Sequence, residues 1–304
     1  MKIPHVLPYQ GSKRKLAPQI LELIDFHVDT LYEPFAGSAA LTIAASNQEI
    51  ANKYVFGDKL GVVSDLWDLV INDPASLADE YEKIWTSQLD DPTKYYNFIR
   101  AEFNKVHNPC YFLYLAARCV KNAIRFNSQG DFNQGMDKRR LGTNPKKMRK
   151  EIFETHSLLT GKSEVRKGDF TEIIKDAMPN DLIYMDPPWQ GTSEKSNPRY
   201  AFLLQLDELI ANFEDLNKRN IPYIVSFDGV CGDKSYGKDL PAYLNLKKLL
   251  INAGRSTQST LLGYDSVTLE SLYLSKAFVE KSSNLIRDEL VRPLESNLQL
   301  QLAV

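Results

Sequence analysis

Short apolar runs alternate with helically spaced apolar residues in the first sixty positions, and again after residue 160. Apolar runs bounded by turn formers are typical of buried strands, and apolar residues three or four apart are typical of helices. The alternation predicts an α/β fold with a parallel, doubly wound sheet. In chain order the predicted elements are a helix over 16–24, a strand over 30–32, a helix over 39–45, a strand over 54–56, a strand near Val165, a strand over 182–185, a helix over 203–216, a strand over 223–227 and a strand over 269–274.

The middle of the chain has a different pattern, because between residues 63 and 150 the apolar spacing is helical throughout. Within it, 111–120 is apolar enough for a buried helix, and 125–133 mixes turn formers with aromatic residues, which indicates a hairpin or an ordered loop. A helical block between two α/β halves predicts an insertion. The expected organisation is a discontinuous catalytic domain over 1–62 and 160–277, a mostly helical insertion over 63–159, and a tail over 278–304 with a weak helix at 285–291.

The composition is that of an ordinary globular protein. Of the 304 residues, 43% are hydrophobic and 25% are charged, which excludes a disordered chain, a collagen-like chain and a disulfide-stapled miniprotein. No apolar run reaches about 18 residues, and the first residues lack the apolar core of a signal peptide, so we expect a cytoplasmic protein that does not enter membranes. We expect no metal site, because the cysteines and histidines do not cluster: Cys110, Cys119, Cys231, His5, His27, His107 and His156.

Positive charge is concentrated in residues 118–150. This window holds ten Lys and Arg residues and two Asp residues, a net charge of +8, whereas the whole chain carries −2. A basic block on an otherwise acidic protein favours a surface that binds a polyanion such as nucleic acid. The alternative is a solvated basic helix, as most charge runs are.

Two predicted strands end in acidic residues next to small residues. Glu33-Pro34-Phe35-Ala36-Gly37-Ser38-Ala39 follows the strand over 30–32, and Asp58 follows the strand over 54–56. Small residues there let the backbone approach a ligand, and the acids can bind a ribose or an amine. The segment is neither a P-loop nor the dinucleotide fingerprint, so a turn without a ligand remains an alternative.

A sharper motif, Asp186-Pro187-Pro188-Trp189, ends the strand over 182–185. The two prolines stiffen the turn and remove two backbone donors, which leaves carbonyl oxygens as acceptors beside the carboxylate. Acceptors next to a large aromatic plane suit a flat ring with an exocyclic amino group. The alternative is a Pro-Pro turn with a core tryptophan.

These motifs resemble those of the Dam-like adenine-specific DNA methyltransferases. Asp186-Pro187-Pro188-Trp189 is similar to their DPPY/DPPW motif, and residues 32–39 are similar to their S-adenosylmethionine loop, FxGxG. Pro8-Tyr9-Gln10-Gly11-Ser12-Lys13 resembles the N-terminal motif, and residues 125–133 match RxNxxGxFN of the DNA-recognition insertion. The four elements occur in the family's order. The chain departs from the pattern at Ala39, which replaces a glycine, and at Trp189, which replaces the commoner tyrosine.

The resemblance implies a Rossmann-like methyltransferase sheet and roles for residues at matching positions. It implies a base pocket formed by Asp186, the carbonyl of Pro187, and Trp189. Residues implied in S-adenosylmethionine binding are Tyr9, Gly11, Ser12, Lys13, Glu33, Phe35, Gly37, Asp58, Asp169 and Asp186. Residues implied in DNA binding are Arg125, Phe126, Asn127, Gln129, Asn133, Lys138, Arg139 and Arg140.

The implied activity is site-specific methyl transfer to N6 of an adenine flipped out of duplex DNA. Two acceptors on the amino group would localise its lone pair, and positioning and electrostatics would supply most of the catalysis. Phosphate contacts are expected from 118–150, and Phe126 is a candidate wedge in the base stack or, alternatively, a core residue beneath a hairpin. We expect a monomer, paired with a restriction endonuclease as the modification enzyme of a restriction-modification system.

Three other functions remain open. In cytosine-N4 DNA methyltransferases a serine usually occupies the position of Asp186. RNA or protein amide methyltransferases commonly have asparagine there and lack the RxNxxGxFN insertion. A DNA-binding homologue without catalysis would not need the intact Asp186 and Gly37.

Overall fold

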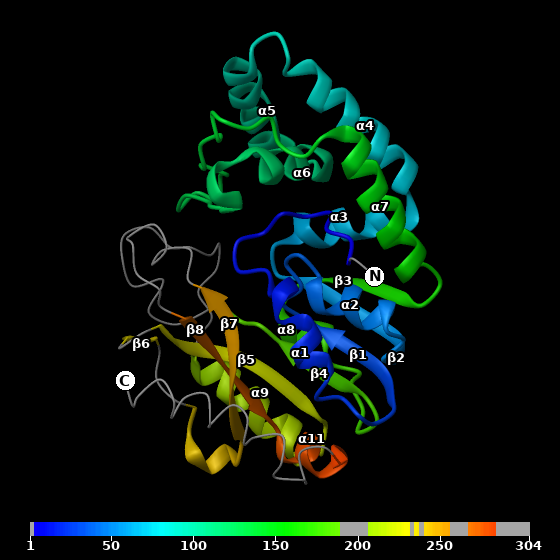
Figure 1. Ribbon diagram of the computed structural model, residues 1–304, viewed down its shortest axis with the longest axis vertical. Coiled ribbons are helices and arrows are strands. Elements are labelled where there is room, and N and C mark those ends of the chain that lie inside the picture. Colours follow the sequence, from blue (N-terminus) through cyan, green and yellow to red (C-terminus); the bar gives the residue numbers. More distant parts are fainter. Residues whose placement is uncertain (1–2, 189–205, 232–233, 237–239, 256–266, 284–304) are drawn as a thin grey trace.

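The computed structural model describes residues 3–188, 206–231, 234–236, 240–255 and 267–283 (Figure 1). A twisted sheet and its helices form the lower part of the view, and the helices of the middle segment lie above them. Within the described residues, no helix combines the length and the apolar character that crossing a bilayer requires. Trp189 and the helix predicted over 285–291 lie outside the described residues.

All strands predicted from the sequence are present. They are β1 (Val28–Glu33), β2 (Ala51–Asp58), β3 (Ser163–Lys167), β4 (Leu182–Met185), β5 (Tyr223–Cys231) and β8 (Val267–Leu274), to which the structure adds β6 (Lys234–Tyr236) and β7 (Lys247–Arg255). Their order across the sheet is β3-β2-β1-β4-β5-β8-β7, and β6 pairs with β5 beside this path.

The prediction of a wholly parallel sheet is wrong at one edge. Strands β3, β2, β1, β4 and β5 pair in parallel, but β8 runs antiparallel to both β5 and β7. Only residues 256–266 separate β7 from β8, which is too short for the helical crossover that parallel neighbours need. The fold is a mixed α/β sheet of Rossmann type in which β8 and the short β6 run antiparallel to the other strands.

Helices pack on the sheet, and helices also make up most of the middle segment. They are α1 (Ala17–Leu21), α2 (Ala40–Asn47), α3 (Gly61–Asn72), α4 (Pro74–Ser87), α5 (Pro92–Val106), α6 (Pro109–Arg118), α7 (Pro145–Leu159), α8 (Phe170–Ile173), α9 (Leu206–Lys218) and α11 (Lys276–Lys281), with 3₁₀ turns η1 (Lys13–Lys15), η2 (Val120–Asn122) and η3 (Ala242–Leu244). The helix predicted over 16–24 is shorter than expected, because η1 precedes it and α1 ends at Leu21.

The helices α4, α5, α6 and α7 begin in the same way. Each starts with proline, and the Asp or Asn before it caps the first turn with its side chain. Asn108, for example, accepts the N–H of Cys110 at 2.8 Å, and Asp91 accepts the N–H of Lys94 at 3.0 Å. Proline tolerates the first helical position and a short polar side chain satisfies an orphan donor, so these Asp-Pro and Asn-Pro pairs determine where each helix starts.

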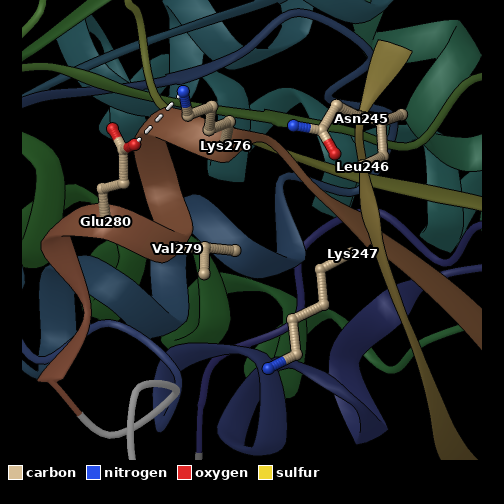
Figure 2. A pocket seen from close by; sticks show the side chains of 6 residues that line it. All are labelled: Asn245, Leu246, Lys247, Lys276, Val279 and Glu280. Carbon is tan, nitrogen blue, oxygen red and sulfur yellow. Dashed lines mark ion pairs between the residues drawn. The ribbon is translucent and has the colours of Figure 1, made fainter. Parts of the chain in front are cut away.

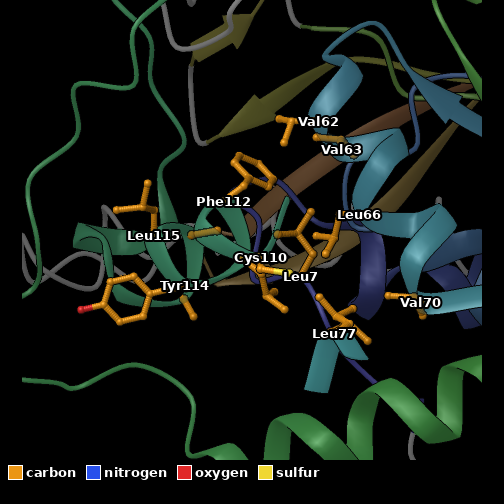
Figure 3. Close-up of a cluster of buried hydrophobic side chains, with 14 of the residues drawn as sticks. Leu7, Val62, Val63, Leu66, Val70, Leu77, Cys110, Phe112, Tyr114 and Leu115 are labelled. Carbon is orange, nitrogen blue, oxygen red and sulfur yellow. The ribbon is translucent and has the colours of Figure 1, made fainter. Parts of the chain in front are cut away.

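One apolar core joins the helical insertion to the sheet. It contains Phe56 of β2. It also contains Val63 and Leu66 of α3 and Phe112 of α6 (Figure 3). The boundary predicted between residues 62 and 63 falls inside α3, which packs on both parts. Because the insertion and the sheet share this core, the insertion is held in a fixed position above the sheet.

The segment predicted as a hairpin or ordered loop, 125–133, is ordered as expected. Phe126 and Phe132 form an isolated antiparallel bridge, and Gly130 turns the chain with a φ of 85°. Gly130 donates its N–H to the Asn127 carbonyl at 3.0 Å.

Candidate active site

Three predicted acidic residues follow neighbouring strands. Glu33 ends β1, Asp58 ends β2, and Asp186 comes directly after β4. Strands β2, β1 and β4 are adjacent and parallel, so their carboxyl ends share one edge. Between β1 and β4 the strand order reverses, which is where open α/β sheets bind their ligands.

The loop after β1 brings bare backbone to this edge. Gly37, with a φ of 45°, donates its N–H to Asp58 Oδ2 at 3.0 Å and accepts the Trp67 Nε1–H at its carbonyl at 2.9 Å. A Cβ at Gly37 would lie 3.5 Å from the ring of Tyr9. Ala39, where the family pattern has glycine, also takes a left-handed conformation, with a φ of 48°, so it occupies a turn that glycine adopts more readily.

The N-terminal motif packs against this loop and against the insertion. Ser38 donates its hydroxyl to Ser12 Oγ at 2.7 Å, and Gln10 donates its N–H to the Asn122 carbonyl at 3.2 Å. Gly11 is exposed, with a φ of 88°. The structure therefore brings Tyr9, Ser12 and Gly37 together, as the motifs predicted.

Glu33 points into the protein. Its carboxylate is buried and accepts the N–H of Thr42, in the first turn of α2, at 2.8 Å. Burial raises the pKa of Glu33 to about 7, although the hydrogen bonds from Thr42 oppose that rise. In this arrangement Glu33 caps α2, and its contact with a ligand stays a prediction.

Asp58 and Asp169 end β2 and the turn after β3. Asp58 accepts the backbone N–H groups of Gly37 and Leu60, the latter at 2.9 Å, and burial raises its pKa to about 6 against those two hydrogen bonds. Asp169 caps α8 and pairs with Lys59 at 3.1 Å. Burial alone would raise the pKa of Asp169, but the ammonium of Lys59 and the groups of Thr171 lower it overall. Both acids lie at the same edge.

Phe35 lies beside these acids. Its ring stacks on Phe170 of α8, with 5.2 Å between the ring centroids, and remains partly exposed. An aromatic wall is thereby placed next to Asp58 and Asp169.

A buried ion-pair cluster lies at the carboxyl end of β4, around Asp186. Lys13 Nζ contacts Asp186 Oδ1 at 3.0 Å and also pairs with Glu270 Oε1. Burial alone would lower the pKa of Lys13, but the carboxylates of Asp186 and Glu270 together raise it, so Lys13 is charged. For Asp186, burial and Glu270 outweigh Lys13 and raise the pKa to about 6.

Glu270 was missed in the sequence analysis. It is buried on β8, where it accepts the hydroxyl of Ser226 at Oε1, at 2.9 Å. A carboxylate between Leu269 and Leu272 of a predicted strand is the signal that could have drawn attention to it.

Tyr184 adds an unsatisfied phenol below Asp186. It is fully buried on β4, and its hydroxyl has no hydrogen-bond partner within the described part of the chain. Burial and the carboxylates of Asp186, Glu270 and Glu33 raise the pKa of this phenol, so it stays protonated.

Two of the three residues of the predicted base pocket are described. Asp186 has a side chain that is 21% exposed, and Pro187 is buried. Trp189 lies outside the described residues.

The predicted DNA-binding residues of the insertion have different surroundings. Lys138, Arg139 and Arg140 are exposed, although Arg140 pairs with the buried Asp137 at 2.8 Å. Asn127 turns its side-chain oxygen inward, to the N–H groups of residues 129 and 131. The remaining three positions, exposed or partly so, are Arg125, Gln129 and Asn133.

Phe126 is only 9% exposed and packs edge-on against Phe132, which favours the core residue beneath a hairpin, and its contact with DNA stays a prediction. One expectation for the insertion needs correction. Arg118, counted in the basic block expected to contact phosphates, is buried. Its guanidinium donates to Gln88 Oε1 at 2.8 Å and to the carbonyls of Asp137 and Arg140.

A hollow of about 210 Å³ lies away from this site. Its lining residues are Asn245, Leu246, Lys247, Lys276, Val279 and Glu280 (Figure 2). Lys247 pairs in register with Leu274, and this pair lies near the start of β5. The hollow therefore opens at the amino ends of the parallel strands, whereas the site lies at their carboxyl ends. No predicted site residue lines it.

Comparison with known proteins gives a family and distant relatives. Residues 9–228 match the model of the D12 class N6 adenine-specific DNA methyltransferases. The type II methyltransferase M1.LlaDCHI of Lactococcus lactis subsp. cremoris is 26% identical over 62% of this chain and 66% of its own length. The DNA N-6-adenine-methyltransferase of Escherichia phage P1 is 26% identical over 74% of this chain but only 30% of its own length. The chain thus spans less than two thirds of these relatives.

A crystal structure of precorrin-6y C5,15-methyltransferase from Geobacter metallireducens matches with a TM-score of 0.34 and 9% identity, over 86% of this chain and 88% of that one. At that score the match supports no argument, and the fold assignment rests on the strand order described above.

Proposed function

The chain belongs to the D12 class N6 adenine-specific DNA methyltransferase family, and from this we propose that it transfers a methyl group from S-adenosylmethionine to N6 of a specific adenine in double-stranded DNA. The observation that carries the proposal is the position of Asp186: a half-buried carboxylate at the switch point of the sheet, beside the Gly37 loop. Trp189, at the position of the aromatic residue in the family's DPPY/DPPW motif, would complete the base pocket.

The residues at the edge fit S-adenosylmethionine. Gly37 offers backbone in a left-handed conformation, with a φ of 45°, that a side chain would strain. Asp58 offers a carboxylate for the ribose hydroxyls, and Phe35 offers a flat apolar wall. An excess of carboxylates over ammonium groups suits a ligand that carries a sulfonium and an ammonium. When bound, that ligand supplies an electrophilic methyl group and a good leaving group.

Asp186 would hold and deprotonate the target amine. The adenine N6 lone pair is delocalised into the ring, so hydrogen bonds from the amino group to Asp186 and the Pro187 carbonyl draw the nitrogen towards tetrahedral geometry. As the new bond to carbon forms, the nitrogen becomes acidic and gives one proton to Asp186. With a pKa of about 6, Asp186 is ionised above that pH and basic enough to accept it.

The insertion would hold the duplex. The exposed Lys138, Arg139 and Arg140 provide phosphate contacts, and Arg125, Gln129 and Asn133 are candidates to contact base edges. Reaching N6 inside a duplex requires flipping the adenine out, at a cost of a few kcal/mol. In its setting the protein would act as a cytoplasmic monomer and as the modification enzyme of a restriction-modification system.

Expression in a methylation-free host tests the proposal. Sequencing of the host DNA should reveal N6-methyladenine in one short sequence motif, and none with the Asp186→Ala variant. Methylation at cytosine N4 would assign a different substrate, and DNA without any methylation, despite cofactor binding in calorimetry, would refute the proposed activity.

A further inference from the structure

Glu270 lies in the proposed active site, but it belongs to none of the motifs that predicted this site. Its strand, β8, is antiparallel to β5, and Ser226 of β5 pairs with Leu272, two residues from Glu270. Because side chains two apart share a face, Glu270 lies on the face that carries Leu272 and Leu274. The same face carries Tyr184, and Asp186 follows two residues later.

The ammonium of Lys13 is shared between two carboxylates. Asp186 offers it Oδ1 at 3.0 Å, and Glu270 offers it Oε1, the oxygen that also accepts the hydroxyl of Ser226. The side chains of Lys13, Asp186 and Glu270 are only 10%, 21% and 6% exposed, so Glu270 is the deepest of the three. The second oxygen of Asp186, Oδ2, has no recorded partner among the described residues.

This sharing solves a problem that the proposed reaction creates. An ammonium held by Asp186 alone would compete with the target amine for that carboxylate, and it would become an unpaired buried charge whenever Asp186 turned to the amine. Breaking a buried pair in that way is strongly unfavourable. A second carboxylate, fixed by a hydrogen bond from the sheet, removes this competition.

We propose that Glu270 is a positioning residue that retains the Lys13 ammonium, so that Asp186 is available to the target amine and to its proton. The proposal rests on the proposed function. Glu270 touches neither substrate and acts through Lys13.

A change in pH dependence follows. The groups facing Asp186 in the described structure are Lys13 of η1, Glu33 of β1, Tyr184 of β4 and Glu270 of β8. Asp186 must be ionised to accept protons, so activity falls as the pH drops through its pKa of about 6. Glu270 raises that pKa, and Lys13 lowers it. Glu270→Gln therefore lowers the pKa of Asp186 in two ways, by removing a negative charge beside it and by removing one of the carboxylates that share the ammonium of Lys13.

The test measures single-turnover methylation between pH 5 and 9, on unmethylated genomic DNA with tritiated S-adenosylmethionine. For Glu270→Gln, measured at saturating cofactor, we expect a rate at pH 8 lower by roughly tenfold and an acid limb displaced downward by about one pH unit. Glu270→Asp retains the charge and should restore the limb and most of the rate.

A matched control is Asp181→Asn. Asp181 is also buried on this sheet, but at the start of β4, where it accepts the N–H groups of Thr30 and Met178 at 2.9 and 2.8 Å. Its replacement should alter stability without displacing the acid limb.

Two results would overturn the inference: a Glu270→Gln rate and limb equal to those of the natural chain, or a slow rate with an undisplaced limb that Glu270→Asp does not restore. Should Glu270→Gln not fold, Glu270→Asp decides: it should keep the natural acid limb and most of the rate, and a folded Glu270→Asp chain whose rate at pH 8 is lower by roughly tenfold or more overturns the inference. If the natural chain methylates no DNA at any pH, the proposed function fails, and this inference fails with it.

Discussion

Lys13 and Arg118 are both buried cations, but the sheet and the insertion hold them with partners of opposite character. Lys13 pairs with the carboxylates of Asp186 and Glu270, and the pKa of Asp186 is raised to about 6 by burial and by Glu270. The partners recorded for Arg118 are neutral: the side-chain oxygen of Gln88, two backbone carbonyls and the sulfur of Met136. The Lys13 cluster can change its protonation at Asp186, whereas the Arg118 hydrogen bonds only support the structure.

The difference indicates what each region does. A cation balanced by ionisable acids can exchange partners during a reaction, since its neighbours can take up a proton. A guanidinium that binds only neutral acceptors keeps its charge and its geometry over the whole accessible pH range. Arg118 thereby holds the backbone of Asp137 and Arg140, on both sides of the exposed Lys138 and Arg139.

Removing Asp186 should have the largest effect in the titrating region. Asp186→Ala deletes the acceptor of the reacting nitrogen and should reduce the methylation rate by about 10³-fold or more. Lys13 keeps Glu270 as a partner, so the fold should survive, which thermal unfolding checks. Near-normal activity would show that Asp186 is not the residue that binds the amine.

Removing Arg118 should have the largest effect in the supporting region. Arg118→Met removes a donor from the carbonyls of Asp137 and Arg140 and one of the two donors of Gln88 Oε1, and it should lower the free energy of unfolding by about 3 kcal/mol. The loss should be equal at pH 5 and pH 8, because the oxygens that Arg118 binds belong to an amide side chain and to the backbone and are neutral at both pH values. The control is Arg149→Met, whose exposed pairs with Asp79 and Glu82 should cost less than about 1 kcal/mol. A loss that varied with pH, or one no larger than the control's, would abolish the contrast with Lys13.

Neutralising the loop that Arg118 supports should weaken DNA binding. Replacing Lys138, Arg139 and Arg140 by glutamine should reduce the slope of log affinity against log salt by roughly 2, because fewer counterions are released. A filter-binding titration at several salt concentrations measures that slope. The matched control neutralises three exposed lysines on the sheet domain: Lys175, Lys218 and Lys276. An equal change in both variants would move the DNA surface elsewhere.

Replacing Glu33 should have a smaller effect, which is a change in how the free energy of unfolding depends on pH. The pKa of Glu33 is raised to about 7 in the folded chain, above its unfolded value, so the folded state holds its proton longer and loses stability as the pH rises from about 4.5 to 7. Glu33→Gln removes that cost. Its stability relative to the natural chain should therefore improve by about 2 kcal/mol between pH 5 and pH 8, measured by urea unfolding. No improvement would mean that Glu33 is ionised throughout.

The sequence predicted the elements whose signals are local. Strand β4 and Asp186 were predictable because a buried strand, a carboxylate and two prolines follow one another without interruption. The helical insertion was predictable from its continuous periodicity. The segment 125–133 was predicted as an ordered loop for the same reason, since turn formers and aromatic residues occur together in it.

Features that depend on distant contacts escaped prediction. Glu270 is far along the chain from Lys13, and only the reversed strand β8 brings them together. Arg118 looks in sequence like any other basic residue near Lys138, but its helix ends against Gln88 and the backbone of residues 137–140. Phe126 matched a family position for an intercalating aromatic, and packing on Phe103 and Phe132 decided its burial.

The measurement that addresses the central claim most directly is the identity of the methylated nucleoside. The purified chain is incubated with unmethylated duplex DNA and S-adenosylmethionine labelled in its methyl group, and the digested nucleosides are separated by mass spectrometry. The label should appear in N6-methyladenine, and it should disappear with Asp186→Ala. Label in N4-methylcytosine, or N6-methyladenine formed equally well without Asp186, would contradict the account.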